Sequence, residues 1–237
     1  MTAAAVLPGL NAVAVAVLPG LAAAVAFTFA TQLARQFAAR RRPHALAWAL
    51  ALALFGLASA AVTVGVSLGW SAPVFGVYWV GGALLNVPLL AVGQLQLLDP
   101  RRSVLYWTLA GLFALWSVLF TGMAGFDGAV LAQASAERAI PLGSDVLGGT
   151  TAYRLVGPFN ATFLVVVAGS VWSAVRGRRW RVLLIALGVS VAAAGSSAIG
   201  SGRDFLFSVL LASGITIMYG GFLAASKPPH RREASPT

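Results

Sequence analysis

The chain has 237 residues, of which 59% are hydrophobic and 9% are charged, and its mean hydropathy is +0.87. A soluble domain carries about 25% charged residues, so this composition excludes an ordinary water-soluble fold. The absence of cysteine excludes disulfides, thiolate metal sites and c-type haem attachment.

Stretches without charge mark the expected membrane spans, because a bilayer core about 30 Å thick needs roughly 20 helical residues. Backbone amides in lipid must be paired internally, so we expect an all-α integral membrane bundle. The turn signal at residues 69–73 divides the uncharged stretch 43–98 into two spans. We predict one domain, 1–226, with seven transmembrane helices at about 12–34, 45–68, 73–97, 103–124, 156–175, 182–200 and 205–226.

The first span is expected to stay in the membrane. The first basic residue is Arg35, so no positively charged region precedes this stretch, as a cleavable signal peptide would require. Pro19 falls inside the span and predicts either a kink or, if the helix begins late, a first-turn proline.

The basic residues set the expected orientation. Thirteen of the sixteen fall in alternate connections and in the tail 227–237, which places these segments and the C-terminus in the cytoplasm and the N-terminus outside. These arginines explain the net charge of +10, and we expect them to attract anionic lipid head groups rather than nucleic acid. Arginine outnumbers lysine fifteen to one, a bias of high-GC bacteria, which favours a multi-pass protein of the bacterial plasma membrane.

The third span carries the strongest intramembrane signal. Pro88 cannot donate a backbone hydrogen bond and is expected to kink or open the helix before it. Asn86 lies one turn after Gly82, so an amide, a freed carbonyl and a small residue share one face. A polar pocket is one interpretation and close helix packing is the other. The candidate ligand-binding residues, including a mid-membrane tryptophan of the fourth span, are Tyr78, Trp79, Gly82, Asn86 and Trp116.

The long outer connection, about 125–157, is the second candidate region, because unstructured loops of this length are often functional. Residues 129–138 are expected to form a short surface helix. Asp127 and Arg154, together with Arg203 and Asp204 on the neighbouring outer turn, could form a lid over the mouth of the bundle. A solvated loop with weak local ion pairs is the alternative.

No ionisable residue is expected at mid-membrane depth. His44 and His230 both lie beside inner arginine clusters, so they cannot clamp a haem inside the bundle, and Lys227 follows the last span, which counts against a retinal Schiff base. No familiar hydrolase, metalloprotease or phosphate-binding motif occurs. We therefore predict no catalytic residues, no metal site and no cofactor.

Four motifs carry a resemblance: Tyr78-Trp79, Leu85-Asn86-Val87-Pro88, Leu90-Ala91-Val92-Gly93 and Leu98-Asp99-Pro100-Arg101. In these the chain resembles a family of uncharacterised seven-span membrane proteins from actinobacteria, which implies a topology and no activity. It is more distantly similar to the seven-span sensor regions that precede some bacterial histidine kinases. Only residues 227–237 follow the last expected span, so a sensor role would need a partner protein.

Three functions follow as hypotheses. The favoured one is a non-enzymatic bundle that binds an apolar or amphipathic ligand or scaffolds a membrane or cytoplasmic partner at its inner face. A transporter or channel component for small molecules or lipids is the alternative, and it predicts broken helices and a polar path. A lipid-modifying membrane enzyme comes third.

Overall fold

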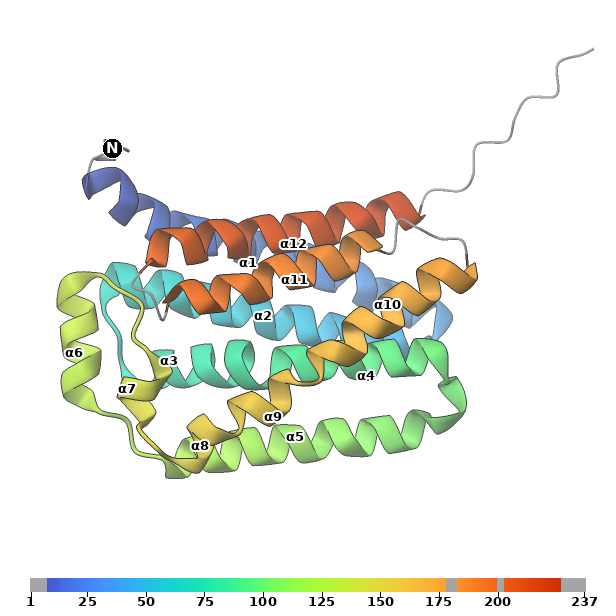
Figure 1. Ribbon diagram of the computed structural model, residues 1–237, viewed down its shortest axis with the longest axis horizontal. Coiled ribbons are helices and arrows are strands. Elements are labelled where there is room, and N and C mark those ends of the chain that lie inside the picture. The colour runs from blue at the N-terminus through green and yellow to red at the C-terminus, as the bar shows by residue number, and fades with distance from the viewer. Residues whose placement is uncertain (1–7, 178–182, 200–202, 227–237) are drawn as a thin grey trace, which may run out of the picture.

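The computed structural model describes residues 8–177, 183–199 and 203–226, and every regular element within these ranges is a helix (Figure 1). This confirms the all-α expectation. In chain order the elements are α1 (Pro8–Arg40), α2 (Pro43–Leu68), α3 (Ala72–Tyr78), the π-helix η1 (Trp79–Leu85), α4 (Asn86–Leu98), the 3₁₀ turn η2 (Pro100–Arg102), α5 (Ser103–Met123), α6 (Gly128–Glu137), α7 (Gly143–Leu147), α8 (Thr151–Arg154), α9 (Val156–Asn160), α10 (Phe163–Gly177), α11 (Leu183–Ile199) and α12 (Asp204–Ser226).

Six of the described helical segments are long and apolar enough to cross a membrane, which supports a multi-pass membrane protein. They are Val13–Arg40, Pro43–Leu68, Ala72–Leu98, Pro100–Met123, Thr151–Arg176 and Asp204–Leu223. The expected span at 182–200 corresponds to α11, which is apolar but has only 17 residues. The predicted tail 227–237 lies outside the described residues.

The helix boundaries differ from the expected ones at two spans. α1 continues from residue 34 to Arg40, because no glycine or proline interrupts the chain there, and Pro19 lies inside this helix. The helix expected to begin at 156 has helical turns from Thr151 onwards, with a break at 161–162 between α9 and α10.

The turn between the second and third spans forms where the sequence predicted it. α2 ends at Leu68, and Gly69 follows with φ of 105°, a conformation that residues with a Cβ rarely adopt. Pro73 lies in the first turn of α3, where its missing N–H costs nothing.

The spans form a ring of neighbours. α2 packs on α1, α1 on α12, α12 on α11, α11 on α10, α10 on α4, and α4 again on α2. The closest pair is α11 and α12, where a Cβ at Gly214 would lie 2.6 Å from the carbonyl oxygen of Gly188, so glycine is required for this approach. α5 packs on α4 from outside the ring. The interior of the ring is therefore bounded by α1, α2, the third span, α10, α11 and α12, and α5 does not border it.

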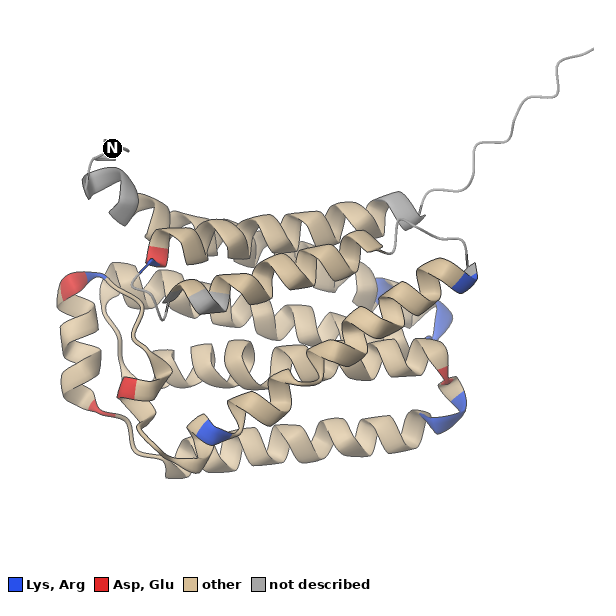
Figure 2. Ribbon diagram, in the orientation of Figure 1, with Lys and Arg blue, Asp and Glu red and all other residues tan. Residues whose placement is uncertain are grey.

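The two ends of the bundle differ in charge (Figure 2). One end, which we call the arginine end, carries the connections at 41–42 and 99–102 and the C-terminus of α10. The other, which we call the loop end, carries the turn at 69–71, the long connection 124–150 and the start of α12, and most of the described acidic residues lie there. This separation matches the charge pattern from which the orientation was predicted.

Candidate functional site

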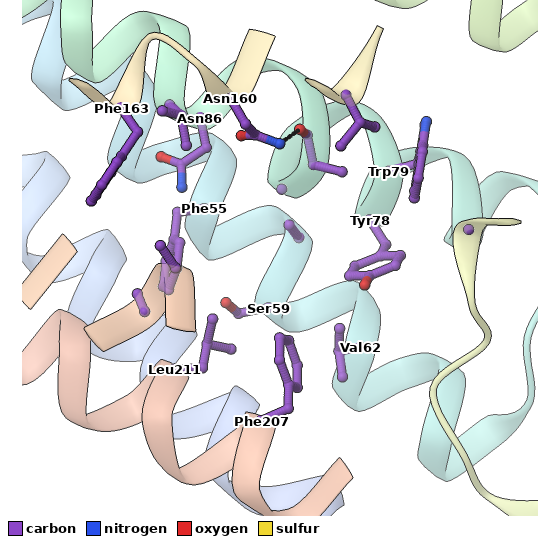
Figure 3. Close-up of a pocket in the computed structure, with 18 of the residues that line it drawn as sticks. Phe55, Ser59, Val62, Tyr78, Trp79, Asn86, Asn160, Phe163, Phe207 and Leu211 are labelled. Atoms are coloured by element: carbon purple, nitrogen blue, oxygen red, sulfur yellow. Dashed lines mark hydrogen bonds between the residues drawn. The ribbon is translucent and has the colours of Figure 1, made fainter. Parts of the chain in front are cut away.

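A cavity of about 660 Å³ lies inside the ring of spans (Figure 3). Its walls come from α2, from the irregular third span, from α11 and α12, and from the α8–α10 segment, while residues 141–144 of the long connection line its loop end. Most lining side chains are apolar, among them Leu52, Phe55, Phe207 and Leu211. A cavity of this size and character is typical of a small-molecule site.

The third span is irregular where it borders this cavity. Its middle turns form the π-helix η1, which ends three residues before Pro88, so the opening predicted from this proline is present. Gly81 and Gly82 allow η1 to press against α2, since a Cβ at Gly81 would lie 3.0 Å from the Leu54 carbonyl oxygen. The wider turns turn the following side chains towards the interior of the ring.

Pro88 also explains a long-range hydrogen bond. The N–H of residue 88 would pair with the carbonyl of Leu84 in an α-helical turn, or, if the wider turns of η1 continued, with that of Ala83, but proline has no N–H to offer. The side-chain amide of Asn160, at the end of α9, donates to the Ala83 carbonyl instead, at 3.2 Å (Figure 3). A backbone group that would otherwise lack a partner is thereby satisfied, as lipid surroundings require.

Four of the five candidate ligand-binding residues line the cavity: Tyr78, Trp79, Gly82 and Asn86. Tyr78, Trp79 and Asn86 follow one another along the third span, and Tyr78 is the nearest of the three to the loop end (Figure 3). Trp116 does not join them. It lies on α5, outside the ring, and its side chain is 45% exposed, so the structure places it on the lipid-facing surface.

Three side chains bring hydrogen-bonding groups to the cavity without a protein partner. Oδ1 of Asn86 is buried and unpaired, and the hydroxyls of Ser59 on α2 and Tyr78 on α3 make no hydrogen bond with any described residue. Ser59 and Asn160 were not predicted. Ser59 is one of few polar residues in a strongly apolar span, a signal that could have identified it, whereas the role of Asn160 depends on a contact 77 residues away.

Residues 141–144 of the long connection line the loop end of the cavity. The backbone of Gly143 packs directly against the ring of Trp79, so a Cβ at this position would overlap the ring. The carboxylate of Asp204 accepts from the backbone N–H of Ile140 at 3.0 Å, and the indole N–H of Trp70 donates to the Ala139 carbonyl at 2.8 Å. Both bonds hold residues 139–140, which directly precede 141–144, against the bundle.

The other charged residues proposed for the mouth have different positions. Asp127 caps the N-terminus of α6, where its carboxylate accepts from two backbone N–H groups at 2.9 and 3.2 Å. Arg154 ends α8, and Arg203 is exposed beside Asp204. Neither arginine forms an ion pair with a described residue. Hydrogen bonds between side chains and the backbone therefore hold this part of the connection against the bundle, and no ion pair forms within the connection among the described residues.

A second group of polar side chains lies between the cavity and the arginine end. Gln94 is two turns after Asn86 on the same face of α4 and contacts Gly169 of α10. Gln94, Gln96 and Ser170 are all at most 3% exposed and contain side-chain atoms without a hydrogen-bond partner. Such groups are costly in an apolar interior unless water or a ligand satisfies them.

Comparison of the chain with protein-family models, with curated proteins and with solved structures finds no match. The site is therefore interpreted from its own residues. Within the described ranges, no group of three or more His, Cys, Asp or Glu side chains is arranged to hold a metal ion.

Proposed function

We propose that this chain is a seven-span protein of the bacterial plasma membrane that binds an apolar or amphipathic ligand in the cavity of its bundle. The cavity is the observation that carries the proposal. Membrane bundles gain stability from close packing of their helices, so an unfilled volume of about 660 Å³ is a cost that ligand binding would offset. Its mostly apolar wall with a few convergent polar groups is the usual composition of a binding site.

The seven-span topology is part of this proposal. It requires α11 to cross the membrane with 17 helical residues, which is at the short end of the range for a span. The proposed orientation places the arginine end in the cytoplasm, where its arginines would bind anionic lipid head groups and could recruit a partner protein. The separation of charges between the two ends supports this orientation (Figure 2).

Transport is the second candidate, and one observation favours it. The unpartnered side chains of Gln94, Gln96 and Ser170 would continue a polar route from Asn86 towards the arginine end if water reached them. The third span is also broken at η1, as in transporters that bind substrates at discontinuous helices.

The test of ligand binding is mass spectrometry of the protein purified in mild detergent. The matched variants are Ala83→Phe, which puts an aromatic ring into the cavity, and Ala24→Phe, which puts the same ring on the exposed face of α1. We expect a small molecule to co-purify with the native chain and with Ala24→Phe and to be lost from Ala83→Phe. An empty native protein, or equal occupancy in all three, would overturn the proposal. Substrate flux in proteoliposomes that Asn86→Ala abolishes would promote the transport function instead.

A further inference from the structure

The cavity has a charge character that restricts its ligand. Of the described residues that line it, none is Asp, Glu, Lys, Arg or His. Asp204 lies at the loop end, where its carboxylate is engaged by the N–H of Ile140. An anionic group moved from water into this cavity would have no counter-ion, and a cationic group would find only the Asp204 carboxylate, near Tyr78 at the loop end and already engaged by Ile140. Over most of its length the cavity leaves the desolvation penalty of a charge uncompensated. The wall therefore favours a ligand that is electrically neutral.

The unpaired polar groups of the wall define what the neutral ligand must present. The hydroxyls of Ser59 and Tyr78 can each donate or accept a hydrogen bond and are not used by a described residue, and the unpartnered Oδ1 of Asn86 can accept one. They come from three elements, α2, α3 and α4, and face the same space (Figure 3). Because Tyr78 and Asn86 are eight residues apart, they are separated by roughly 12 Å along the span. An elongated ligand with hydroxyl or carbonyl oxygens would satisfy them.

Exposed lining residues mark the side of the bundle at which we place the opening of the cavity. Three residues that line the cavity are also exposed on the surface: Ser144 of α7, Tyr153 of α8, which is 39% exposed, and Ala193 of α11. Ala193 is six residues before Ile199 at the end of α11, or about 9 Å along the helix from the loop end. At the loop end itself, Gly143 closes the cavity against Trp79.

α11 exposes other apolar side chains besides Ala193. Ala194 is exposed beside it, and Leu184 and Leu187, further towards the arginine end and on other faces of the helix, are 38% and 51% exposed. An opening at this depth, between α11 and the α7–α8 segment, would connect the cavity with the hydrocarbon of the bilayer. A ligand dissolved in the membrane could enter there without crossing water.

We propose that the ligand is an uncharged, elongated lipid bearing hydroxyl or carbonyl oxygens, and that it enters sideways from the bilayer past Ala193. This inference rests on the proposed ligand-binding function and adds the chemical class and the route. Lipid chains fill the apolar part of the cavity, the ligand oxygens accept hydrogen bonds from Ser59 and Tyr78, and a ligand hydroxyl donates to Oδ1 of Asn86.

The ligand class can be tested with four probes that share one hydrocarbon chain. Oleyl alcohol and methyl oleate are neutral, whereas oleate and oleylamine are both charged at a pH between their pKa values. Binding to the native protein in detergent, measured by native mass spectrometry, is expected to be at least about tenfold tighter for the neutral pair. The cavity-filling variant Ala83→Phe shows which binding belongs to the cavity.

The route can be tested with two adjacent exposed residues. Ala193→Phe narrows the opening, while Ala194→Phe places the same ring on the neighbouring lipid-facing position, which does not line the cavity. Brominated oleyl alcohol quenches tryptophan fluorescence, so its uptake by protein in bilayer discs can be timed. We expect uptake to slow about tenfold in Ala193→Phe and to be unchanged in Ala194→Phe.

The outcomes separate the two proposals. If no probe binds, or if Ala83→Phe binds all four as the native protein does, the ligand-binding function itself fails. If oleate or oleylamine binds the cavity as tightly as oleyl alcohol, the neutral class is wrong and ligand binding stands. If Ala193→Phe and Ala194→Phe take up the probe at equal rates, the sideways route is wrong.

Discussion

The side-chain amide of Asn160 donates to the backbone carbonyl of Ala83, which joins the end of α9 to the π-helix at the cavity wall. Two parts of the chain contribute to this bond. The third span provides the missing N–H of Pro88 and the widened turns of η1, and the later segment provides the break between α9 and α10. The bond holds the irregular stretch of the third span in one arrangement, and so it fixes the position of Asn86 three residues further along.

Replacing Asn160 with leucine removes the donor and keeps the volume. The Ala83 carbonyl then has no partner in an apolar setting, and we expect the protein to lose about 1–3 kcal/mol of stability. Thermal unfolding in detergent, followed by circular dichroism, measures this as a lower midpoint.

A double-mutant cycle controls this experiment. Pro88→Ala restores the backbone N–H that the carbonyl of Ala83 lacks, so the cost of Asn160→Leu is expected to shrink in the Pro88→Ala background. An equal cost in both backgrounds would show that Asn160 stabilises the bundle by packing and not by replacing the proline N–H.

The bond between Asp204 and Ile140 makes the covering of the cavity testable. Asp204→Ala removes the acceptor, and we expect the amide protons of residues 139–144 to exchange with solvent about tenfold faster or more, because a hydrogen bond to a charged group contributes about 1.5–3 kcal/mol. Hydrogen–deuterium exchange read by mass spectrometry measures this directly.

Two variants serve as controls for the Asp204 experiment. Asp204→Asn keeps an oxygen acceptor and should give an intermediate rate. Asp145→Ala removes an exposed carboxylate in the same connection whose recorded partner is the adjacent Ser144 hydroxyl, and it should leave the protection of 139–143 unchanged. Loss of protection in Asp145→Ala of the same size would mean that general loosening, and not this bond, controls the segment.

Much of the fold could be predicted from sequence because the controlling signals are local. Uncharged stretches marked the spans, Gly69 and Pro73 marked a turn, and Pro88 marked the irregular third span, and the structure has a helical break or boundary at each of these places. The π-helical form of the break was not predicted, since it also requires Gly81 and Gly82 to let α2 approach.

The candidate site was predictable only along one wall. Tyr78, Trp79, Gly82 and Asn86 belong to one span, so their common face follows from helical spacing. Trp116 was chosen by its depth in the fourth span, but α5 packs outside the ring and this side chain faces lipid. Which span packs on which is decided by contacts between distant segments, and a single sequence carries little signal for these. Ser59 and Asn160 were missed for the same reason.

The contact between Gly143 and Trp79 predicts a strong effect of a single methyl group. In Gly143→Ala the added Cβ would collide with the Trp79 ring, so the connection must lift or the ring must turn. We expect a loss of about 1–3 kcal/mol and a change in the near-ultraviolet circular dichroism of tryptophan.

Gly128→Ala is the matched control, because a Cβ at Gly128 would meet nothing within 4 Å and this residue begins α6. It should unfold at or above the native temperature, since alanine favours a helix. Trp79→Leu in the Gly143→Ala background should recover part of the lost stability. If Gly143→Ala is as stable as the native chain, residues 141–144 do not press on the cavity wall.

Cysteine labelling tests whether α11 crosses the membrane. The sequence has no cysteine, so single variants Arg176→Cys and Arg203→Cys each carry one thiol, at exposed positions on either side of α11. If α11 spans the bilayer, a membrane-impermeant maleimide added to intact cells labels Arg203→Cys, and labels Arg176→Cys only after the cells are opened. The remaining arginines at 178, 179 and 181 keep the positive charge that sets this orientation.

Two further variants serve as controls for the two sides. Ala136→Cys, on the exposed side of α6, should label like Arg203→Cys, and Arg101→Cys should label like Arg176→Cys. Labelling of positions 176 and 203 from the same side would show that α11 does not cross, and the protein would then have six spans with its termini on one side.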